Sequence, residues 1–216
     1  MKIFLLLAAV WVPSFAWAQI CPVRLSPFPT ESWAKDTSVT ASRTAELKAL
    51  EDYAFTLTGT DAQRKGVRTD ALVIVKGGKI VYERYGRGFD ETKRHISWSV
   101  AKSITSALTG VAVKKGVIKT SDSICTYLKG ARPDLCPITV QNLLEFGSGM
   151  HWQESYENQS YQYSSVISML FGEGHRDMTS FILSHRKAHD PGTFFNYSTG
   201  EADLLAEVIR QAAEPT

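Results

Sequence analysis

The 216-residue sequence lacks several features that would assign it to a broad class of protein. After the first 18 residues no apolar run approaches the about 20 residues that a membrane span requires, so no membrane span is expected. The formal net charge is only +2, which argues against nucleic acid or an anionic membrane as a partner. No internal repeat or low-complexity tract is evident. With 44% hydrophobic and 21% charged residues, the sequence is that of a globular chain able to bury a core.

Cysteine is scarce, with three residues, and none stands in a Cys-x-x-Cys pair or beside a histidine pattern that would hold a metal. Cys125 and Cys136 flank a polar loop, and an oxidising compartment would allow them to pair. Such a disulfide contributes about 3 kcal/mol to stability in the chain-entropy description. Cys21 is then left over, and we expect it to be unpaired.

Residues 1–18 have the pattern of an export signal. Lys2 gives a positive start, an apolar run follows, and residues 16–18 (Ala-Trp-Ala) form a small-x-small cleavage site. The mature chain is therefore expected to begin near Gln19 and to be exported, either to the periplasm or out of the cell. A lipid anchor on Cys21 is the alternative, which is disfavoured because no small residue directly precedes that cysteine.

The first half of the chain predicts a helix followed by a β-hairpin. Residues 22–41, rich in proline, serine and threonine, are expected to form an extended leader, and an amphipathic helix is expected over 43–55. Two strand-like runs, 71–76 and 79–85, are joined by the Gly-Gly pair that a tight hairpin turn prefers. The first run is almost wholly apolar, which predicts a strand inside a sheet with both faces covered.

From residue 98 onward the spacing of apolar residues predicts helices. The first helix should have a buried face and stop near Gly116. Its apolar repeat consists of Ala101, Ile104, Leu108 and Val111. Three further helices are indicated by their caps, which are Thr139 (with a stop at the glycines 147 and 149), Asp177, and the capping box Ser198-x-x-Glu201.

Ser99 and Lys102 form a Ser-x-x-Lys pair at the expected start of the first of these helices. The i, i+3 spacing puts the hydroxyl and the amine on one face, about one turn apart. Free N–H groups at a helix start favour negative charge beside Ser99, and a lysine shielded from water can accept the serine proton. The alternative is a helix cap followed by a solvated lysine, and the pair by itself does not decide between the two.

Five segments, in their order and spacing, resemble the serine hydrolases related to class C β-lactamases and penicillin-binding proteins. The resemblance is strongest to the branch of esterases and aminohexanoate-oligomer hydrolases. The matching segments are residues 73–81, 97–103, 138–144, 148–152 and 191–198. The resemblance implies an α+β fold of the β-lactamase/transpeptidase type over residues 19–216. An antiparallel sheet flanked by helices would pack beside a mostly helical region, with a catalytic groove between them.

The resemblance also implies roles. Ser99 would be the acylated nucleophile, Lys102 its base, and Tyr197 the residue that relays a proton to the leaving group. Thr199 stands where the family commonly has asparagine, so a hydroxyl would replace an amide toward the substrate or Lys102. The family's Lys-Thr-Gly strand, which supplies part of the oxyanion hole, has no counterpart in the sequence. We therefore expect an incomplete sheet in a C-terminally truncated family member that is poorly folded and nearly inactive by itself.

His151 and Trp152 are the further candidates for contact with substrate, although a structural role is the alternative for each. The aromatic, polar segment around them either walls the substrate site or is a surface loop packed by its own rings; it contains Trp152, Tyr156, Tyr161 and Tyr163. His185 and His189 have the helical spacing of metal ligands. Because Arg186 stands where a zinc protease has glutamate, no metal is expected there.

Two classes of function remain. The first is a serine hydrolase that cleaves an ester or amide bond through an acyl-enzyme on Ser99, acting on a small-molecule ester, amide or peptide without a cofactor. The second is a truncated, non-catalytic family member that acts at most as a binding module. The sequence predicts neither the particular substrate nor the oligomeric state.

Overall fold

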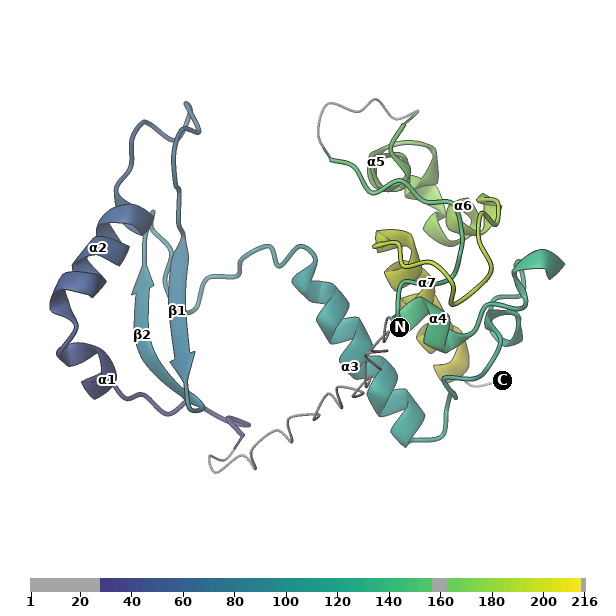
Figure 1. The fold of residues 1–216 in the computed structure, drawn as a ribbon, viewed down its shortest axis with the longest axis horizontal. Helices are drawn as coiled ribbons and strands as arrows, with labels where there is room; N and C mark the ends of the chain where they lie inside the picture. The colour runs from purple at the N-terminus through teal and green to yellow at the C-terminus, as the bar shows by residue number, and fades with distance from the viewer. Residues whose placement is uncertain (1–27, 157–162, 215–216) are drawn as a thin grey trace, which may run out of the picture. The chain divides into compact units, whose positions relative to one another are not determined.

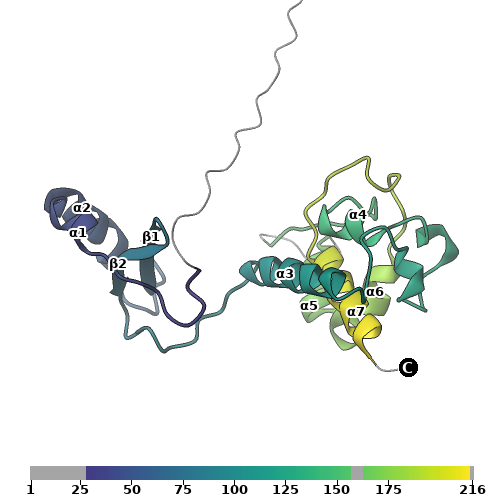
Figure 2. The ribbon, with the colours of Figure 1, turned by 90° about the horizontal axis from the view of Figure 1, so that it is seen from below.

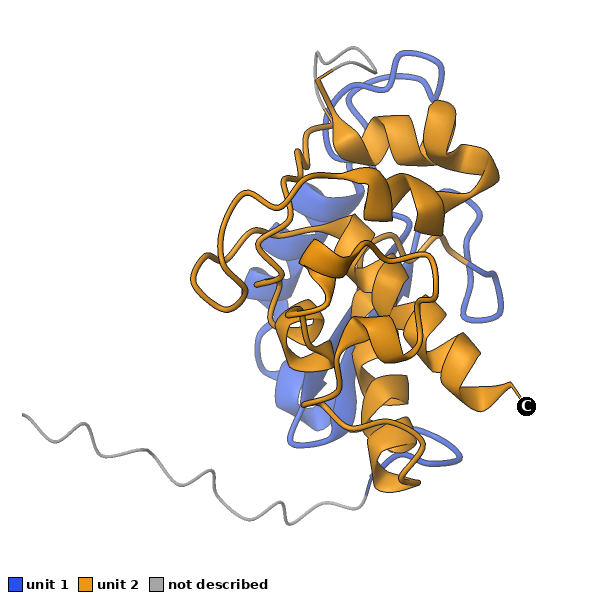
Figure 3. Cartoon of the chain, turned by 90° about the vertical axis from the view of Figure 1, so that its right-hand side faces the viewer, with its two compact units in different colours: residues 1–94 blue, residues 95–216 orange. Residues whose placement is uncertain are grey.

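The computed structural model describes residues 28–156 and 163–214. The chain divides into two compact units, residues 1–94 and 95–216, which Figure 3 colours blue and orange. The first unit buries Ala54 and Val81, and the second contains a larger apolar cluster. The expected export signal and Cys21 lie outside the described residues.

The first unit combines helices with a β-hairpin (Figure 1). The strands are antiparallel, with Ala71 opposite Tyr85. Both turn glycines have positive φ, 57° at Gly77 and 78° at Gly78, as a tight hairpin turn requires. The predicted hairpin and the helix before it are confirmed. The elements are α1 (Ser38–Ala41), α2 (Thr44–Phe55), β1 (Ala71–Lys76) and β2 (Lys79–Tyr85).

Helix α2 is tied to strand β2 by the carboxylate of Glu51. This carboxylate accepts a hydrogen bond from the Tyr82 hydroxyl at 2.7 Å and pairs with Arg84 Nη1 at 2.6 Å. The Arg84 guanidinium also lies 4.5 Å from the centroid of the Phe55 ring, which belongs to α2. Polar and aromatic contacts therefore join the helix to the hairpin.

The segment before α2 differs from the extended leader that was expected. Within its described part, Ser38–Ala41 form helix α1 and Lys35 forms a parallel bridge with Ile80 of β2. The Ile80 N–H donates to the Ala34 carbonyl, and the Asp36 N–H donates to the Ile80 carbonyl, both at 2.9 Å. Composition does not predict these contacts, because they join backbone N–H and C=O groups, which almost every residue carries.

Strand β1 is more exposed than its apolar sequence predicts. Among the described residues the sheet has two strands, and Val73 and Val75 are 44% and 46% exposed. The expectation of a strand with both faces covered is therefore wrong. An apolar run shows that side chains are suited to burial, but the neighbouring elements decide whether they are buried.

The second unit is helical in its described part. Helices α3 and α7 have 15 residues each. Nowhere in residues 28–156 and 163–214 is a helix long and apolar enough to cross a membrane. The elements are α3 (Val100–Lys114), η1 (Ile124–Thr126), η2 (Pro133–Leu135), α4 (Val140–Leu144), α5 (Ser165–Phe171), η3 (Glu173–Arg176), α6 (Met178–Ser184) and α7 (Thr199–Ala213).

Helix α7 supplies the centre of the second unit's core. Leu204 and Val208 are completely buried and Leu205 is nearly so. Figures 1 and 2 show α3 and α7 side by side, and α4 and α6 also pack on α7. Burying a side chain of this size contributes about 1.5–3 kcal/mol, so α7 is firmly held. The same cluster includes Ile124, Leu135, Ile138, Leu143, Met169 and Ile182.

Polar caps start two of the helices as predicted. At α4, Thr139 Oγ1 accepts from the Asn142 N–H and the Asn142 side chain accepts from the Thr139 N–H, which completes a capping box. At α6, Asp177 accepts a backbone N–H of the first turn. Helix α4 ends at Leu144, before the glycines expected to stop it, because the chain already turns left-handed at Phe146 (φ 52°).

The capping box predicted at α7 forms only in part. Ser198 Oγ accepts from the Glu201 N–H at 3.0 Å. The Glu201 side chain does not return to the Ser198 backbone, and it accepts from Ser148 Oγ at 2.7 Å and from the Ser148 N–H at 3.3 Å. The N–H and hydroxyl of Ser148 therefore donate to Glu201 in place of the Ser198 N–H that a full capping box would use.

The apolar repeat of α3 is exposed, although it was predicted to be buried. Ile104, Leu108 and Val111 are 58%, 53% and 50% exposed. The buried residues of the helix are Thr109 and Ala112. The predicted helix is confirmed and its predicted buried face is wrong, because periodicity identifies an apolar face without showing what covers it.

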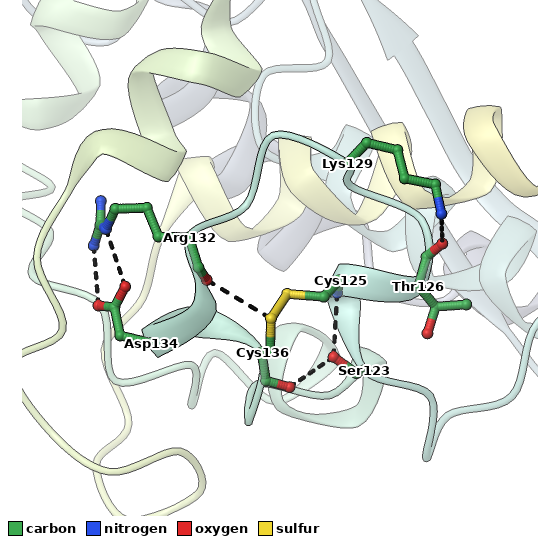
Figure 4. Close-up of a disulfide and its surroundings, with 7 residues drawn as sticks. All are labelled: Ser123, Cys125, Thr126, Lys129, Arg132, Asp134 and Cys136. Carbon is green, nitrogen blue, oxygen red and sulfur yellow. Dashed lines mark hydrogen bonds and ion pairs between the residues drawn. A yellow bond between two sulfur atoms is a disulfide. The ribbon is translucent and has the colours of Figure 1, made fainter.

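Cys125 and Cys136, the pair expected from the sequence, are joined by a disulfide (Figure 4). Ser123 Oγ donates to the Cys136 carbonyl at 2.6 Å and accepts from the Cys125 N–H at 3.2 Å. Arg132, inside the loop, donates to the carbonyl of Leu183 in α6 at 2.6 Å. The loop is thus closed covalently and hydrogen-bonded to a neighbouring helix.

Replacing both Cys125 and Cys136 with serine should lower the free energy of unfolding by about 3 kcal/mol, because the disulfide closes a loop in the unfolded chain. Urea unfolding followed by circular dichroism measures the change. Dithiothreitol should destabilise the unsubstituted chain and leave the double variant unaffected. Equal unfolding midpoints for the two chains without reductant would contradict the prediction.

Candidate active site

Ser99 lies at the start of α3 and is exposed. It is the N-cap residue, yet its side chain makes no capping hydrogen bond. The preceding residue, Trp98, has φ 45°, a left-handed conformation that is unfavourable for a residue other than glycine. Backbone strain of this kind is frequent at active sites, where it directs a side chain. The Ser99 hydroxyl is therefore available to a group other than the backbone.

The N–H groups at this helix start are engaged, contrary to the expectation that they would be free. Those of Val100, Ala101 and Lys102 each donate to the carbonyl oxygen three residues earlier, at 3.0–3.1 Å. They close a tight turn of the 3₁₀ type. These three groups therefore do not supply free donors to a negative charge beside Ser99.

Lys102 connects α3 to α7. Its Nζ lies 3.1 Å from Ser99 Oγ and 3.0 Å from Thr199 Oγ1, within hydrogen-bond distance of both. The side chain is partly buried, so the amine is not freely solvated. Together with the uncapped Ser99 hydroxyl, this geometry argues against a helix cap followed by a solvated lysine.

Tyr197 presents the face of its ring to Lys102. The Lys102 Nζ lies 5.1 Å from the ring centroid, within cation–π distance. The ring also packs against Phe146, with the two centroids 5.1 Å apart. Within the described part of the chain, no hydrogen bond joins the Tyr197 hydroxyl to Ser99 or Lys102. The ring is at the site, and a proton relay requires its hydroxyl to turn toward the amine.

Glu154 lies on the other side of Thr199 from Lys102 and accepts several hydrogen bonds. Its carboxylate accepts from the Thr199 N–H at 2.9 Å, from the Thr199 hydroxyl, from Trp152 Nε1 at 2.6 Å and from the Tyr156 hydroxyl. Burial by itself would raise the pKa of Glu154, but these hydrogen bonds outweigh it and hold the pKa below its usual value. Glu154 is therefore ionised at neutral pH.

Asp203 is a second acid near Lys102. It lies one turn after Thr199 on the same face of α7. Burial raises the pKa of Asp203, the charge of Lys102 opposes this shift, and the charge of Glu154 adds to it. No motif in the sequence marks either acid as part of the site. The i, i+4 spacing of Thr199 and Asp203 was a usable signal, whereas Glu154 lies in an irregular segment where spacing gives none.

Trp152, a candidate for contact with substrate, lies inside the protein. It is 6% exposed, and a Cβ at Gly200 would come within 2.8 Å of its ring. The indole therefore packs against the start of α7, and its Nε1–H donates to Glu154 from the protein interior. Of the tyrosines in the same segment, Tyr156 and Tyr163 are exposed, and Tyr161 lies outside the described residues.

His151, the other candidate, lines a different hollow. It faces a cavity of about 1110 Å³ together with His175 and His185, and neither Ser99 nor Lys102 lines that cavity. The structure therefore brings Thr199 to the Ser99–Lys102 pair and leaves His151 apart from it.

A smaller hollow of about 300 Å³ lies beside Lys102. Helices α3, α4 and α7 contribute to its walls, with Thr105, Leu144 and Leu205 among the lining residues. Its lining mixes Lys102 and hydroxyl residues with apolar side chains, and Ser99, Tyr197 and Thr199 are not among the lining residues.

The sequence profile of the Beta-lactamase family matches residues 50–216. This chain belongs to the beta-lactamase family. Among curated proteins, it is 23% identical over 187 residues to a 6-aminohexanoate-dimer hydrolase of Paenarthrobacter ureafaciens. That alignment covers 82% of this chain and 46% of the relative.

Solved structures share the fold of this beta-lactamase-family chain. A candidate 6-aminohexanoate-dimer hydrolase from Bacillus anthracis matches with a TM-score of 0.61 at 22% identity, over 89% of this chain and 50% of that one. The octameric penicillin-binding protein homologue from Pyrococcus abyssi matches with a TM-score of 0.55 at 21% identity, over 80% and 39%. The expected β-lactamase/transpeptidase-like fold is confirmed, and the chain spans about half the length of these relatives.

The two histidines with metal-ligand spacing have other contacts in this family member. His185 Nδ1 lies 3.0 Å from the Phe181 carbonyl oxygen, and its ring centroid lies 5.3 Å from that of Trp152. His189 stacks on Phe194 with the centroids 4.3 Å apart. Among the residues that the structure describes, no group of three or more His, Cys, Asp or Glu side chains is arranged to hold a metal.

Glu201, two residues after Thr199, points into the core of the beta-lactamase-family unit. It is 2% exposed, and its carboxyl group accepts from the hydroxyl and the N–H of Ser148. Burial raises the pKa of Glu201 to about 7, although the Ser148 hydrogen bonds oppose the shift. The folded chain therefore keeps a proton on Glu201 at pH values where an unfolded glutamate has lost it.

Stability should accordingly fall as the pH rises from about 4.5 to about 7, because the folded chain binds more protons than the unfolded chain in this window. Glu201→Gln keeps an acceptor for Ser148 and cannot titrate, so it should reduce the fall by about 1–3 kcal/mol. Urea unfolding at pH 5 and pH 8 measures the effect. The exposed Glu145 gives the matched control, Glu145→Gln, which should keep the pH dependence of the unsubstituted chain. An unchanged pH dependence in Glu201→Gln as well would mean that the buried carboxyl is ionised.

Proposed function

We propose that this chain carries the nucleophile of a serine hydrolase that cleaves an ester or amide bond through an acyl-enzyme on Ser99. Lys102 is the base and Tyr197 the proton relay. The observation that carries the proposal is the 3.1 Å contact between Ser99 Oγ and Lys102 Nζ, made by a hydroxyl that is not used as a helix cap. Membership of the beta-lactamase family supports the same chemistry.

The acylation step follows from this pair. In the proposed step the unprotonated form of Lys102 accepts the proton of the Ser99 hydroxyl, and Oγ attacks the carbonyl carbon of the substrate to form a tetrahedral intermediate. As the bond to the leaving group breaks, the alcohol or amine takes a proton. Tyr197, whose ring lies 5.1 Å from Lys102 Nζ, passes this proton from the lysine to the leaving group. Water then hydrolyses the acyl-enzyme, with Lys102 again as base.

The proposed substrate is a small ester, amide or peptide. Two of the relatives carry the name 6-aminohexanoate-dimer hydrolase, which supports a short linear amide within this class. Serine, lysine and tyrosine supply nucleophile, base and acid, so the proposed reaction uses no cofactor.

We also propose that the chain is exported to the periplasm or out of the cell. The export-signal pattern at residues 1–18 supports this. The disulfide between Cys125 and Cys136 supports it independently, because such bonds persist in oxidising compartments.

A fluorophosphonate probe, which reacts with activated serine, tests the nucleophile. Ser99→Ala should abolish labelling, whereas Ser180→Ala, at an exposed serine of α6, should keep it. Mass spectrometry of the labelled peptide locates the adduct. Labelling that persists in Ser99→Ala would rule out Ser99 as the nucleophile, and its absence from the folded, unsubstituted chain would favour the alternative, a non-catalytic binding module.

Replacing Lys102 distinguishes a base from a structural residue. Lys102→Ala should slow acylation at saturating probe by about 10²–10⁴-fold, as expected for lost general-base catalysis, and should change the half-saturating concentration by less than about threefold. Lys114→Ala, in the exposed last turn of the same helix, is the control and should acylate normally. Equal losses in rate and in binding would show a structural lysine.

A further inference from the structure

We infer that Glu154 is a positioning residue for Lys102: it fixes the direction of the Thr199 hydroxyl, so that Lys102 donates to Thr199 and keeps its lone pair for the proton of Ser99. The inference rests on the proposed function, because it concerns how the base of that reaction is oriented. Glu154 acts through Thr199, which it contacts at both the backbone N–H and the hydroxyl.

The direction of the Thr199 hydroxyl follows from the donors around Glu154. An ionised carboxylate offers lone pairs and has no hydrogen to donate. The groups that surround it are Trp152 Nε1–H, the Tyr156 hydroxyl, and the N–H and hydroxyl of Thr199. A threonine hydroxyl has a single hydrogen. Because Glu154 can only accept, that hydrogen points at Glu154.

The opposite side of Thr199 Oγ1 then carries only lone pairs. Lys102 Nζ, 3.0 Å away, must therefore be the donor in this contact. A neutral amine has two hydrogens and one lone pair. When one hydrogen is directed to Thr199, the lone pair remains for the hydroxyl of Ser99, whose oxygen lies 3.1 Å from Nζ. A reversed Thr199 hydroxyl would donate to the amine and occupy the lone pair that the reaction needs.

The surroundings of Glu154 keep its carboxylate in place. Trp152 donates from a buried position at 2.6 Å, and the absence of a side chain at Gly200 lets the indole lie against α7. The N–H of Thr199 fixes the carboxylate to the first turn of the same helix at 2.9 Å. Moving Glu154 would break several hydrogen bonds of partly buried groups at once, which is costly. The carboxylate oxygen of Glu154 that accepts from the Thr199 hydroxyl is therefore held in one position, and it fixes the direction of that hydroxyl.

Saturation kinetics of Ser99 acylation by the fluorophosphonate test the inference in the 216-residue chain. Glu154→Gln introduces a group that can donate to Thr199, so the hydroxyl can turn toward Lys102. Thr199→Val keeps the shape and removes the acceptor. Each variant should lower the limiting acylation rate at least about tenfold and change the half-saturating probe concentration less than about twofold, because lost orientation affects the transition state more than binding.

Three further variants separate positioning from a structural role. Thr199→Ser keeps the hydroxyl and should retain the rate within about threefold. The double variant Glu154→Gln/Thr199→Val should be no slower than Thr199→Val, because the effect of Glu154 passes through that hydroxyl. Glu207→Gln, which removes an acid paired with Arg210 on the same helix, is the control and should acylate at the unsubstituted rate.

Urea unfolding checks that each variant is folded. If Glu154→Gln is not, Glu154→Asp replaces it with the same expected loss, since the shorter acid falls short of the hydroxyl. Acylation at the unsubstituted rate in the folded Glu154 variant, or a double variant whose loss is the product of the two single losses, overturns the inference and leaves Ser99 as the nucleophile. A failure of the probe to label Ser99 in the unsubstituted chain overturns the proposed function and this inference together.

Discussion

The geometry of the site depends on one row of hydrogen bonds that runs from Ser99 through Lys102 and Thr199 to Glu154. The contact between Lys102 and Thr199 joins residues 97 positions apart, so it exists only when α3 and α7 are packed together. Each member of the row orients the next. An isolated Ser-x-x-Lys pair on a helix has no such restraint, and its lysine is free to extend into water.

Helix α7 gives this row its rigidity. Its first turn carries Thr199 toward Lys102, while Leu204 and Val208 on the same helix are completely buried. Glu201, two residues after Thr199, is fixed in the core by Ser148. A site built on a helix that the core already holds is positioned more precisely than a site on a loop. Thr199 adds a requirement of its own, because a hydroxyl, unlike the amide of asparagine, needs a partner such as Glu154 to set its direction.

Local signals in the sequence predicted the local structure well. The Gly-Gly turn predicted the hairpin, Thr139 and Asp177 predicted helix starts, and the family resemblance brought Ser99 and Lys102 to attention. Burial was predicted poorly, since the apolar faces of β1 and α3 are exposed. The sequence also did not predict contacts between side chains that lie far apart along the chain. Glu154 meets Thr199 45 positions later, and no periodicity of the sequence connects an irregular segment with a helix start.

The most direct test of the catalytic geometry is a crystal structure of the chain in which the Lys102 side chain is resolved. We predict that Nζ lies within hydrogen-bond distance, about 3 Å, of both Ser99 Oγ and Thr199 Oγ1. A Lys102 side chain that extends into solvent, away from Ser99, would contradict the proposed chemistry and leave membership of the beta-lactamase family as the conclusion that stands.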